Sequence, residues 1–258
     1  MYKKVNQLKM GTLLSYITIA IQNLIAIIYT PIMLRLLGQN EYGLYQLGSS
    51  AVSYLGLLSF GFGSSYVKFY FEYKVQKNEE GIRKLNSIFL LVYLGISFIS
   101  VITGGGMIAS ADILFKGSLS ASDIAQVRVL MLILVISLAL TFLNVIFDCY
   151  ITAHERYIFQ RIMLIAVTVL NPFITLPLLL MGYRSTALVV VNLILSVFRT
   201  GMNIYYCIFK LHMKFQFRGM EVRVLKNVGT FSLYIFLNEI ASQINWNVDK
   251  IILGAVQG

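Results

Sequence analysis

The sequence has little charge, and this shortage decides its class. Only 12% of its 258 residues are Asp, Glu, Lys or Arg, about half of the roughly 25% that is usual in globular proteins. Hydrophobic residues make up 58% of the chain, and the mean hydropathy is +0.77. So few charged side chains cannot cover the surface of a soluble domain of this size. We therefore expect an integral membrane protein.

Cysteine, histidine and the common catalytic motifs are also scarce. The two cysteines, Cys149 and Cys207, lie at the ends of apolar runs and indicate no disulfide framework. His154 and His212 have no companion ligands at metal-binding spacing, which favours solvated loop residues over metal ligands. The chain has no GxxxxGKS/T, no GxGxxG before a helix and no HExxH. We expect no metal, no cofactor and no enzymatic activity.

Long apolar runs recur along the chain instead. A helix needs roughly 20 apolar residues to cross a hydrocarbon core of about 30 Å. The runs are continuous rather than alternating, so they indicate helices and not barrel strands. The expected spans are residues 10–34, 42–67, 85–111, 129–147, 162–183 and 185–209, with a weaker seventh segment from about Gly229. The expected fold class is an all-α integral membrane protein.

Lys and Arg are distributed unevenly over the connections between these spans. Fifteen fall on one side of the membrane and five on the other, with Arg199 inside a span. The positive-inside rule then places the N-terminus in the cytoplasm. The connections 69–84 and 210–228 are basic and amphipathic and suit the membrane surface. The net charge of +10 thus has the lipid bilayer as its expected partner, and nucleic acid is not expected.

Polar residues within the spans follow single helical faces. The fourth span carries four of them at spacing i, i+4, i+7 and i+11, and the sixth span repeats that spacing. Interhelical hydrogen bonds, worth about 0.6 kcal/mol each, account for the Ser and Thr members, whereas several converging stripes suggest a hydrated cavity. The stripes are Ser137, Thr141, Asn144 and Asp148; Asn192, Ser196, Arg199 and Asn203; Ser15, Thr18 and Gln22; and Glu239, Ser242, Trp246 and Asp249.

Arg199 and Glu239 are the stripe members that hydrogen bonding explains least. A charge at the centre of a membrane helix costs about 2.5–3.5 kcal/mol, and Arg199 lies 11 residues before Lys210, about 16 Å into the span. The alternatives for Arg199 are a structural ion pair or snorkelling, and for Glu239 a structural role. We expect substrate binding by Arg199, Asn192, Asn203, Gln22 and Asn144, and proton coupling or ion pairing by Glu239 and Asp148.

Three segments resemble a known family. Residues 37–45, LGQNEYGLY, resemble the LGxxEYGxY segment of bacterial Wzx-type flippases of lipid-linked oligosaccharides. These flippases belong to the MOP superfamily, as do the MATE multidrug transporters. Residues 61–70, GFGSSYVKFY, are similar to the end of the family's second helix, and residues 245–254, NWNVDKIILG, to its seventh helix. The resemblance covers the whole chain.

The resemblance implies a domain organisation. Family members have two six-helix bundles that form a V around a central cavity, with 12 or 14 helices in all. Residues 1–226 would be the N-terminal six-helix bundle, and residues 227–258 the seventh segment, the start of a truncated second bundle. Leu253-Gly254 loosely repeats Leu37-Gly38, as expected for the second copy of a repeat. A missing C-terminal half, or another copy of the chain, would complete the V.

The resemblance also implies a function. The leading hypothesis is a transporter that flips an undecaprenyl-pyrophosphate-linked oligosaccharide across the bacterial cytoplasmic membrane for export of cell-surface polysaccharide. The cationic Arg199 suits a pyrophosphate better than a cationic drug. The alternatives are a MATE-like drug or cation antiporter, a membrane-embedded glycan polymerase, and a scaffold without transport. The absence of a large outer loop in this sequence counts against the polymerase.

Overall fold

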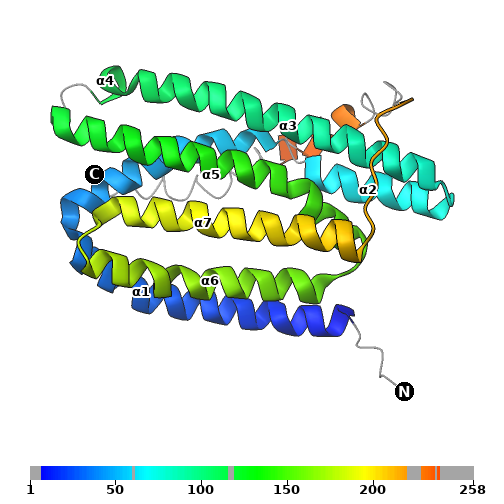
Figure 1. Cartoon of the computed structure of the whole chain (residues 1–258), viewed down its shortest axis with the longest axis horizontal. Coiled ribbons are helices and arrows are strands. Elements are labelled where there is room, and N and C mark those ends of the chain that lie inside the picture. Colours follow the sequence, from blue (N-terminus) through cyan, green and yellow to red (C-terminus); the bar gives the residue numbers. More distant parts are fainter. Residues whose placement is uncertain (1–6, 60–61, 116–118, 220–227, 236, 239–258) are drawn as a thin grey trace, which may run out of the picture. The chain divides into compact units, whose positions relative to one another are not determined.

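The computed structural model describes residues 7–59, 62–115, 119–219, 228–235 and 237–238 (Figure 1). Most residues in these ranges are helical and none lies in a strand, which confirms the expected all-α fold class. The chain divides into two compact units. The first consists of Met1–Leu58 and Leu90–Met213, and the second of Ser59–Phe89 and Lys214–Gly258. The elements are α1 (Gln7–Ser53), η1 (Tyr54–Ser59), α2 (Phe62–Val75), α3 (Glu79–Ala109), α4 (Ala111–Leu114), α5 (Ala121–Ala153), α6 (Tyr157–Leu180), α7 (Arg184–Tyr205) and the π-helical turn η2 (Tyr206–Lys210).

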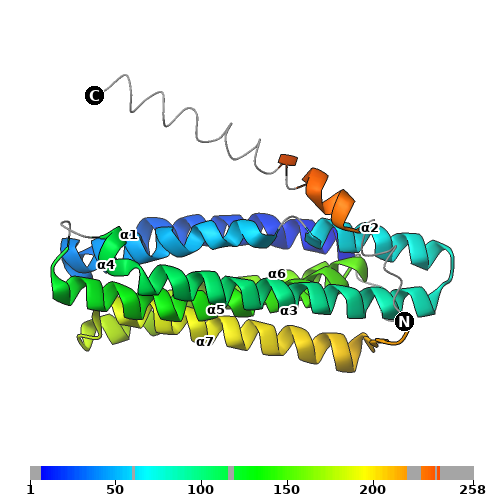
Figure 2. The same ribbon diagram turned by 90° about the horizontal axis from the view of Figure 1, so that it is seen from above.

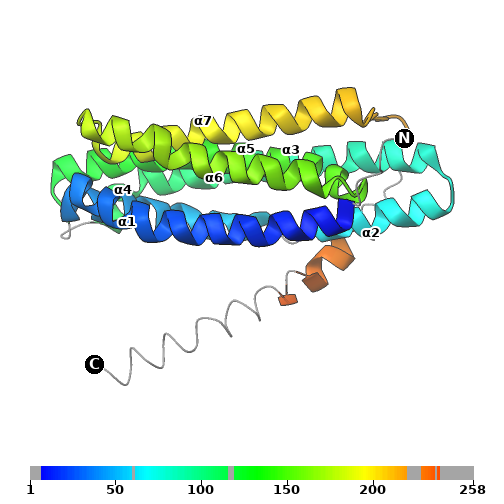
Figure 3. The ribbon, with the colours of Figure 1, turned by 90° about the horizontal axis from the view of Figure 1, so that it is seen from below.

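The first unit is a bundle of long helices. Figures 2 and 3 show α1, α5, α6 and α7 lying side by side along its length, with α5 packed on α7 and α1 on α6. Two apolar clusters join the helices. One is Leu44, Val52, Val127, Leu130, Met131, Val135 and Val189, and the other is Met33, Leu37, Leu179, Ala187 and Leu188.

A glycine divides α1 into two helical segments. Gly38 has φ 76° and ψ 166°, a backbone conformation that is not helical. Residues other than glycine rarely adopt these angles. The chain turns back at this point (Figure 1), so residues 7–37 and 39–53 form separate helices. The expected spans 10–34 and 42–67 are therefore joined by this one turn rather than by a loop.

Five helical stretches are long and apolar enough to cross a membrane, counted over the described residues. They are Gln7–Val75, Glu79–Ala109, Ala121–Ala153, Tyr157–Leu180 and Arg184–Lys210. The first contains two of the expected spans, so all six spans expected between residues 10 and 209 are accounted for. Large apolar side chains such as Ile27, Phe173 and Leu180 are exposed on these helices, as lipid contact requires. The chain is a multi-pass membrane protein.

The expected connection 69–84 is mostly helical. Helix α2 continues to Val75 and α3 starts at Glu79, so only residues 76–78 separate them. The Asn78 carboxamide accepts a hydrogen bond from the Gly81 amide at 2.8 Å and caps α3. The basic residues of this region are good helix formers. An apolar run thus marks what the membrane covers and not where a helix ends.

In the second unit, an extended segment is bound to α3. The Asn86 side chain donates to the Lys214 carbonyl at 2.9 Å, and the Ser87 hydroxyl accepts from the Gln216 amide at 2.7 Å. The Tyr66 hydroxyl donates to Asn86 at 2.6 Å. Asn86 and Ser87 are buried, so these bonds satisfy groups that water does not reach.

The expected seventh segment is described only in part. Residues 228–235 and 237–238 are helical. Glu239 and residues 240–258 lie outside the described residues, and the expected domain boundary after residue 226 therefore stays a prediction.

Candidate functional site

The polar stripes of α5 and α7 face each other along a parallel helix pair. Because the two helices run in the same direction (Figure 1), three hydrogen-bonded pairs along them share a separation of 59 residues in the sequence. Ser137 therefore meets Ser196, and not Asn192, which has the corresponding place in its own stripe. The bonded pairs are Gln126 with Ser185 at 2.9 Å, Ser137 with Ser196 at 3.1 Å and Asn144 with Asn203 at 2.9 Å.

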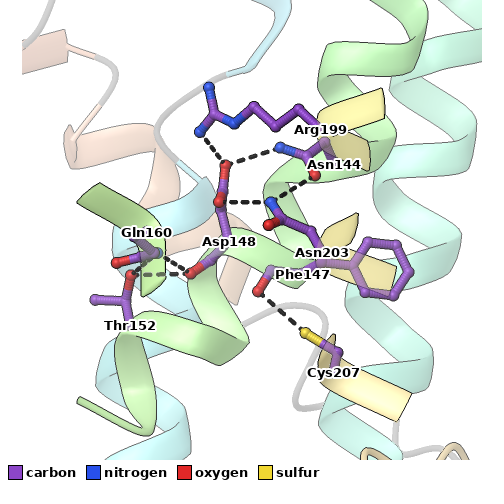
Figure 4. A network of polar contacts seen from close by, with 8 residues as sticks. All are labelled: Asn144, Phe147, Asp148, Thr152, Gln160, Arg199, Asn203 and Cys207. Atoms are coloured by element: carbon purple, nitrogen blue, oxygen red, sulfur yellow. Dashed lines mark hydrogen bonds and ion pairs between the residues drawn. The ribbon is translucent and has the colours of Figure 1, made fainter. Parts of the chain in front are cut away.

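Asp148 is the centre of the network (Figure 4). Its Oδ2 accepts hydrogen bonds from Arg199 Nη2 at 2.7 Å and from Asn144 Nδ2 at 2.8 Å, and its Oδ1 accepts one from Asn203 Nδ2 at 2.8 Å. One of the three donors is a guanidinium, so the ion pair offsets the cost of removing the carboxylate from water. The sequence suggested Asp148 as an ion-pair or coupling residue, and the structure pairs it with Arg199.

Arg199 is the other charge of the site. Its side chain is 36% exposed, against 25% for Asp148. A guanidinium has five N–H donors in a rigid fork. Among the described residues, Asp148 is the acceptor to which these donors bond. Most of the fork thus remains available to a bound group.

A cavity of about 100 Å³ opens beside Arg199. Three helices contribute to it, and its surface is about half polar and half apolar. The lining residues are Thr141 and Asn144 of α5, Val167 of α6, and Asn192, Leu195, Ser196, Arg199 and Thr200 of α7. The cavity holds a small group such as a phosphate rather than a whole glycan.

Asn171 of α6 borders this region, and the sequence pattern did not identify it. Its Nδ2 donates to Asn192 Oδ1 at 3.0 Å and so ties α6 to α7. In the sequence, Asn171 stands before Pro172, where the pattern signals only a kink; α6 nevertheless continues through Pro172 and Pro177.

The end of α5 is held by neighbours that the stripes also missed. Gln160 of α6 donates to the Asp148 carbonyl at 2.8 Å and to the Thr152 hydroxyl at 2.9 Å. The Cys207 thiol contacts the Phe147 carbonyl at 3.5 Å. These bonds fix the backbone around Asp148 (Figure 4). Gln160 precedes the apolar run of its helix, so no periodic signal marks it.

The other expected site residues are placed less uniformly. Asn144, Asn192 and Asn203 lie in the network or in the cavity wall. Gln22 is on an exposed position of α1 and is not among the cavity-lining residues. Glu239 lies outside the described residues, so its role is a prediction from the sequence.

The described residues contain no group of three or more His, Cys, Asp and Glu side chains that could hold a metal ion. His154 instead contacts the Tyr150 carbonyl at 2.9 Å, and its ring lies against the Tyr150 ring at a tilt of 46°. Both cysteines are free thiols.

Solved structures with a similar fold are membrane transporters. A MATE protein in complex with MaD3S aligns with a TM-score of 0.70 and 14% identity over 92% of this chain and 54% of that chain. An outward-facing MATE multidrug resistance transporter of the MOP superfamily aligns with a TM-score of 0.66 and 14% identity over 91% of this chain and 51% of that chain. A MOP superfamily transporter from Pyrococcus furiosus, described as having a binding pocket of reverse polarity, aligns with a TM-score of 0.62 and 13% identity over 91% and 53%.

These likenesses identify a MATE-like fold. The chain spans about half the length of these solved structures. A comparison with curated proteins gives no match. A family model described as "Polysaccharide biosynthesis protein" matches residues 8–258. The chain thus belongs to the polysaccharide biosynthesis protein family, and it has a MATE-like fold.

Proposed function

We propose that this protein transports a lipid-linked oligosaccharide, an undecaprenyl-pyrophosphate glycan, across the bacterial cytoplasmic membrane. Membership of a polysaccharide biosynthesis family and a fold shared with transporters support transport of a polysaccharide precursor. The observation that carries the substrate class is Arg199, a cation beside a cavity between the helices that is partly lined by polar side chains.

Arg199 can bind a pyrophosphate by exchanging partners. Its fork matches two phosphate oxygens, and Asp148 holds the guanidinium at 2.7 Å when no anion is bound. The Asp148 carboxylate retains the amide donors of Asn144 and Asn203 when Arg199 leaves it. The pair thus keeps the empty site neutral and competes with weakly bound anions.

The transport cavity needs a second wall. The chain spans about half the length of the transporters it resembles, and the exposed side chains of α1 include Gln22. We propose that a second bundle, from a longer protein or from another copy, covers this face. Alternating access would then come from the two bundles rocking about the site.

A cation antiporter is the second candidate, because Asp148 supplies a carboxylate that can bind a cation. Three donors already surround that carboxylate, so a cation would have to displace Arg199. An anion competes with Asp148 for the guanidinium, but it can also bind the N–H groups of Arg199 that Asp148 leaves unused. The geometry therefore favours an anionic substrate.

Ligand binding by the purified chain in nanodiscs tests the substrate class. We expect a polyprenyl-pyrophosphate oligosaccharide to bind, and the same glycan on an uncharged polyprenol to bind weakly. Charged hydrogen bonds are worth about 1.5–3 kcal/mol, so Arg199→Ala should weaken binding by about 10- to 150-fold. Arg199→Lys keeps the charge without the fork and should be intermediate.

The matched control is Arg128→Ala, which removes an arginine that is paired with Asp112 outside this site. It should bind as the unmodified chain does. Unchanged binding by a well-folded Arg199→Ala variant would exclude Arg199 as the anion site. Tighter binding of a cationic dye by that variant would favour the antiporter.

A further inference from the structure

A second partly buried carboxylate, Glu41, lies in the first unit away from Arg199. Its Oε2 accepts hydrogen bonds from the Ser185 hydroxyl at 2.6 Å, from Gln126 Nε2 at 2.6 Å and from the Ser185 amide at 3.3 Å. Its Oε1 lies 3.5 Å from Arg184 Nη1. The Glu41 side chain is 13% exposed, and Ser185 is fully buried. Glu41 therefore bonds to both α5 and α7.

The N-terminus of α7 has no cap from its own sequence. Tyr183 is the N-cap residue and makes no side-chain cap bond, and the first turn contains no acidic residue. Arg184 has φ 49°, an uncommon conformation for a side chain of this kind. A helix N-terminus has unpaired N–H groups and a partial positive charge, which an anion stabilises. Glu41 supplies that anion from a distant part of the chain.

The turn at Gly38 brings Glu41 to this position. Gly38 breaks α1 three residues before Glu41, which places the carboxylate on the first turn of the returning helix. The segment LGQNEYGLY thus contains both the turn and the acid. Its glutamate, Glu41, bonds to Gln126 and Ser185, which are not part of the proposed anion site.

We propose that Glu41 is a positioning residue that caps α7 from α1 and clamps the ends of α1, α5 and α7 together. Helix α7 also carries Arg199 and Asn203, so the clamp fixes the first turn of the helix on which the proposed anion site is built. This inference rests on the proposed function only for its consequence in transport. The capping contact itself can be tested without a substrate.

Hydrogen exchange of the full chain in nanodiscs measures the cap directly. Glu41→Gln keeps the size and removes the charge. We expect amide exchange in residues 184–188 to rise about tenfold, with residues 199–205 changed less than twofold. Adding Tyr183→Asp, a carboxylate at the N-cap position, should return the exchange to within about twofold of the unmodified chain.

The matched control is Asp112→Asn, which removes the acid of the exposed Arg128 pair and should leave residues 184–188 unchanged. Normal exchange there in Glu41→Gln would overturn the capping role. So would a uniform rise over α5, α6 and α7, which indicates general destabilisation, or a failure of Tyr183→Asp to restore protection. Because no ligand is used, these outcomes are independent of whether Arg199 binds an anion.

Discussion

The Asp148–Arg199 pair combines two groups that respond differently to the loss of a partner. Arginine stays charged in proteins, whereas a carboxylate can take up a proton. Asp148 also keeps two amide donors, from Asn144 and Asn203, when Arg199 is absent. Arg199 has no second carboxylate among its described partners. Replacing Asp148 should therefore lower the stability of the protein more than replacing Arg199.

A double-mutant cycle tests this asymmetry through the free energy of unfolding. Asp148→Asn should lower stability by about 1.5–3 kcal/mol, the value of a charged hydrogen bond. Arg199→Gln should cost less, and the double variant should cost less than the sum of the two. Denaturant unfolding in detergent micelles provides the measurement.

The exposed pair Asp112–Arg128 is the control for this cycle. Its side chains are 65% and 37% exposed, so its coupling should be below about 1 kcal/mol. Equal coupling energies in the two pairs would show that the Asp148–Arg199 pair is no more shielded from solvent than the exposed pair.

At the scale of helices, close packing is confined to particular glycines. The run Gly104-Gly105-Gly106 near the end of α3 is typical of tight helix contact. A Cβ built on Gly104 would lie 2.6 Å from Val135 Cγ2 on α5, but one on Gly105 or Gly106 would meet nothing within 4 Å. Only the first glycine of the three is needed for the contact between α3 and α5.

We expect Gly104→Ala to destabilise the chain by about 1–3 kcal/mol, because the added methyl group overpacks the contact. Gly105→Ala should be neutral or stabilising by up to about 1 kcal/mol, since alanine is the better helix former. Melting of the two variants in the same detergent compares them. A larger loss from Gly105→Ala than from Gly104→Ala would contradict this packing.

At the scale of the whole molecule, charge is distributed differently over the ends of the first unit. The turn in α1, the start of α5 and the α6–α7 connection lie at one end in Figure 1. Arg128 and Arg184 of that end are paired with Asp112 and Glu41. The opposite end carries more positive than negative side chains. They are Lys9, Arg156, Arg161 and Lys210 on the positive side and Glu155 on the negative side. We infer that the second end faces the cytoplasm.

Cysteine labelling tests this orientation. Gln76 and Ser122 are both exposed, in the α2–α3 turn and at the start of α5. An impermeant thiol reagent on intact cells should label Ser122→Cys, and should label Gln76→Cys only after the membrane is opened. The unmodified chain controls for Cys149 and Cys207. The reverse pattern would invert the topology.

The sequence by itself determined the class, the spans and most residues of the polar network around Asp148. A shortage of charge and the length of apolar runs are sufficient for this, because lipid imposes the same requirement on every spanning segment. Periodicity also identified Asn144, Asp148, Arg199 and Asn203, since residues on one helical face recur at fixed spacing. It could not identify Gln160 or Asn171, which lie outside any stripe.

Only the tertiary structure decided which residues meet. The spacing is the same in both stripes, but the register between α5 and α7 depends on how the helices pack. From the sequence, Asp148 was therefore only one of several possible partners of Arg199. The role of Glu41 was equally hidden, because the acid and the helix that it caps are 144 residues apart. Local patterns specify faces of helices, whereas a pair between distant helices is selected by packing of the whole bundle.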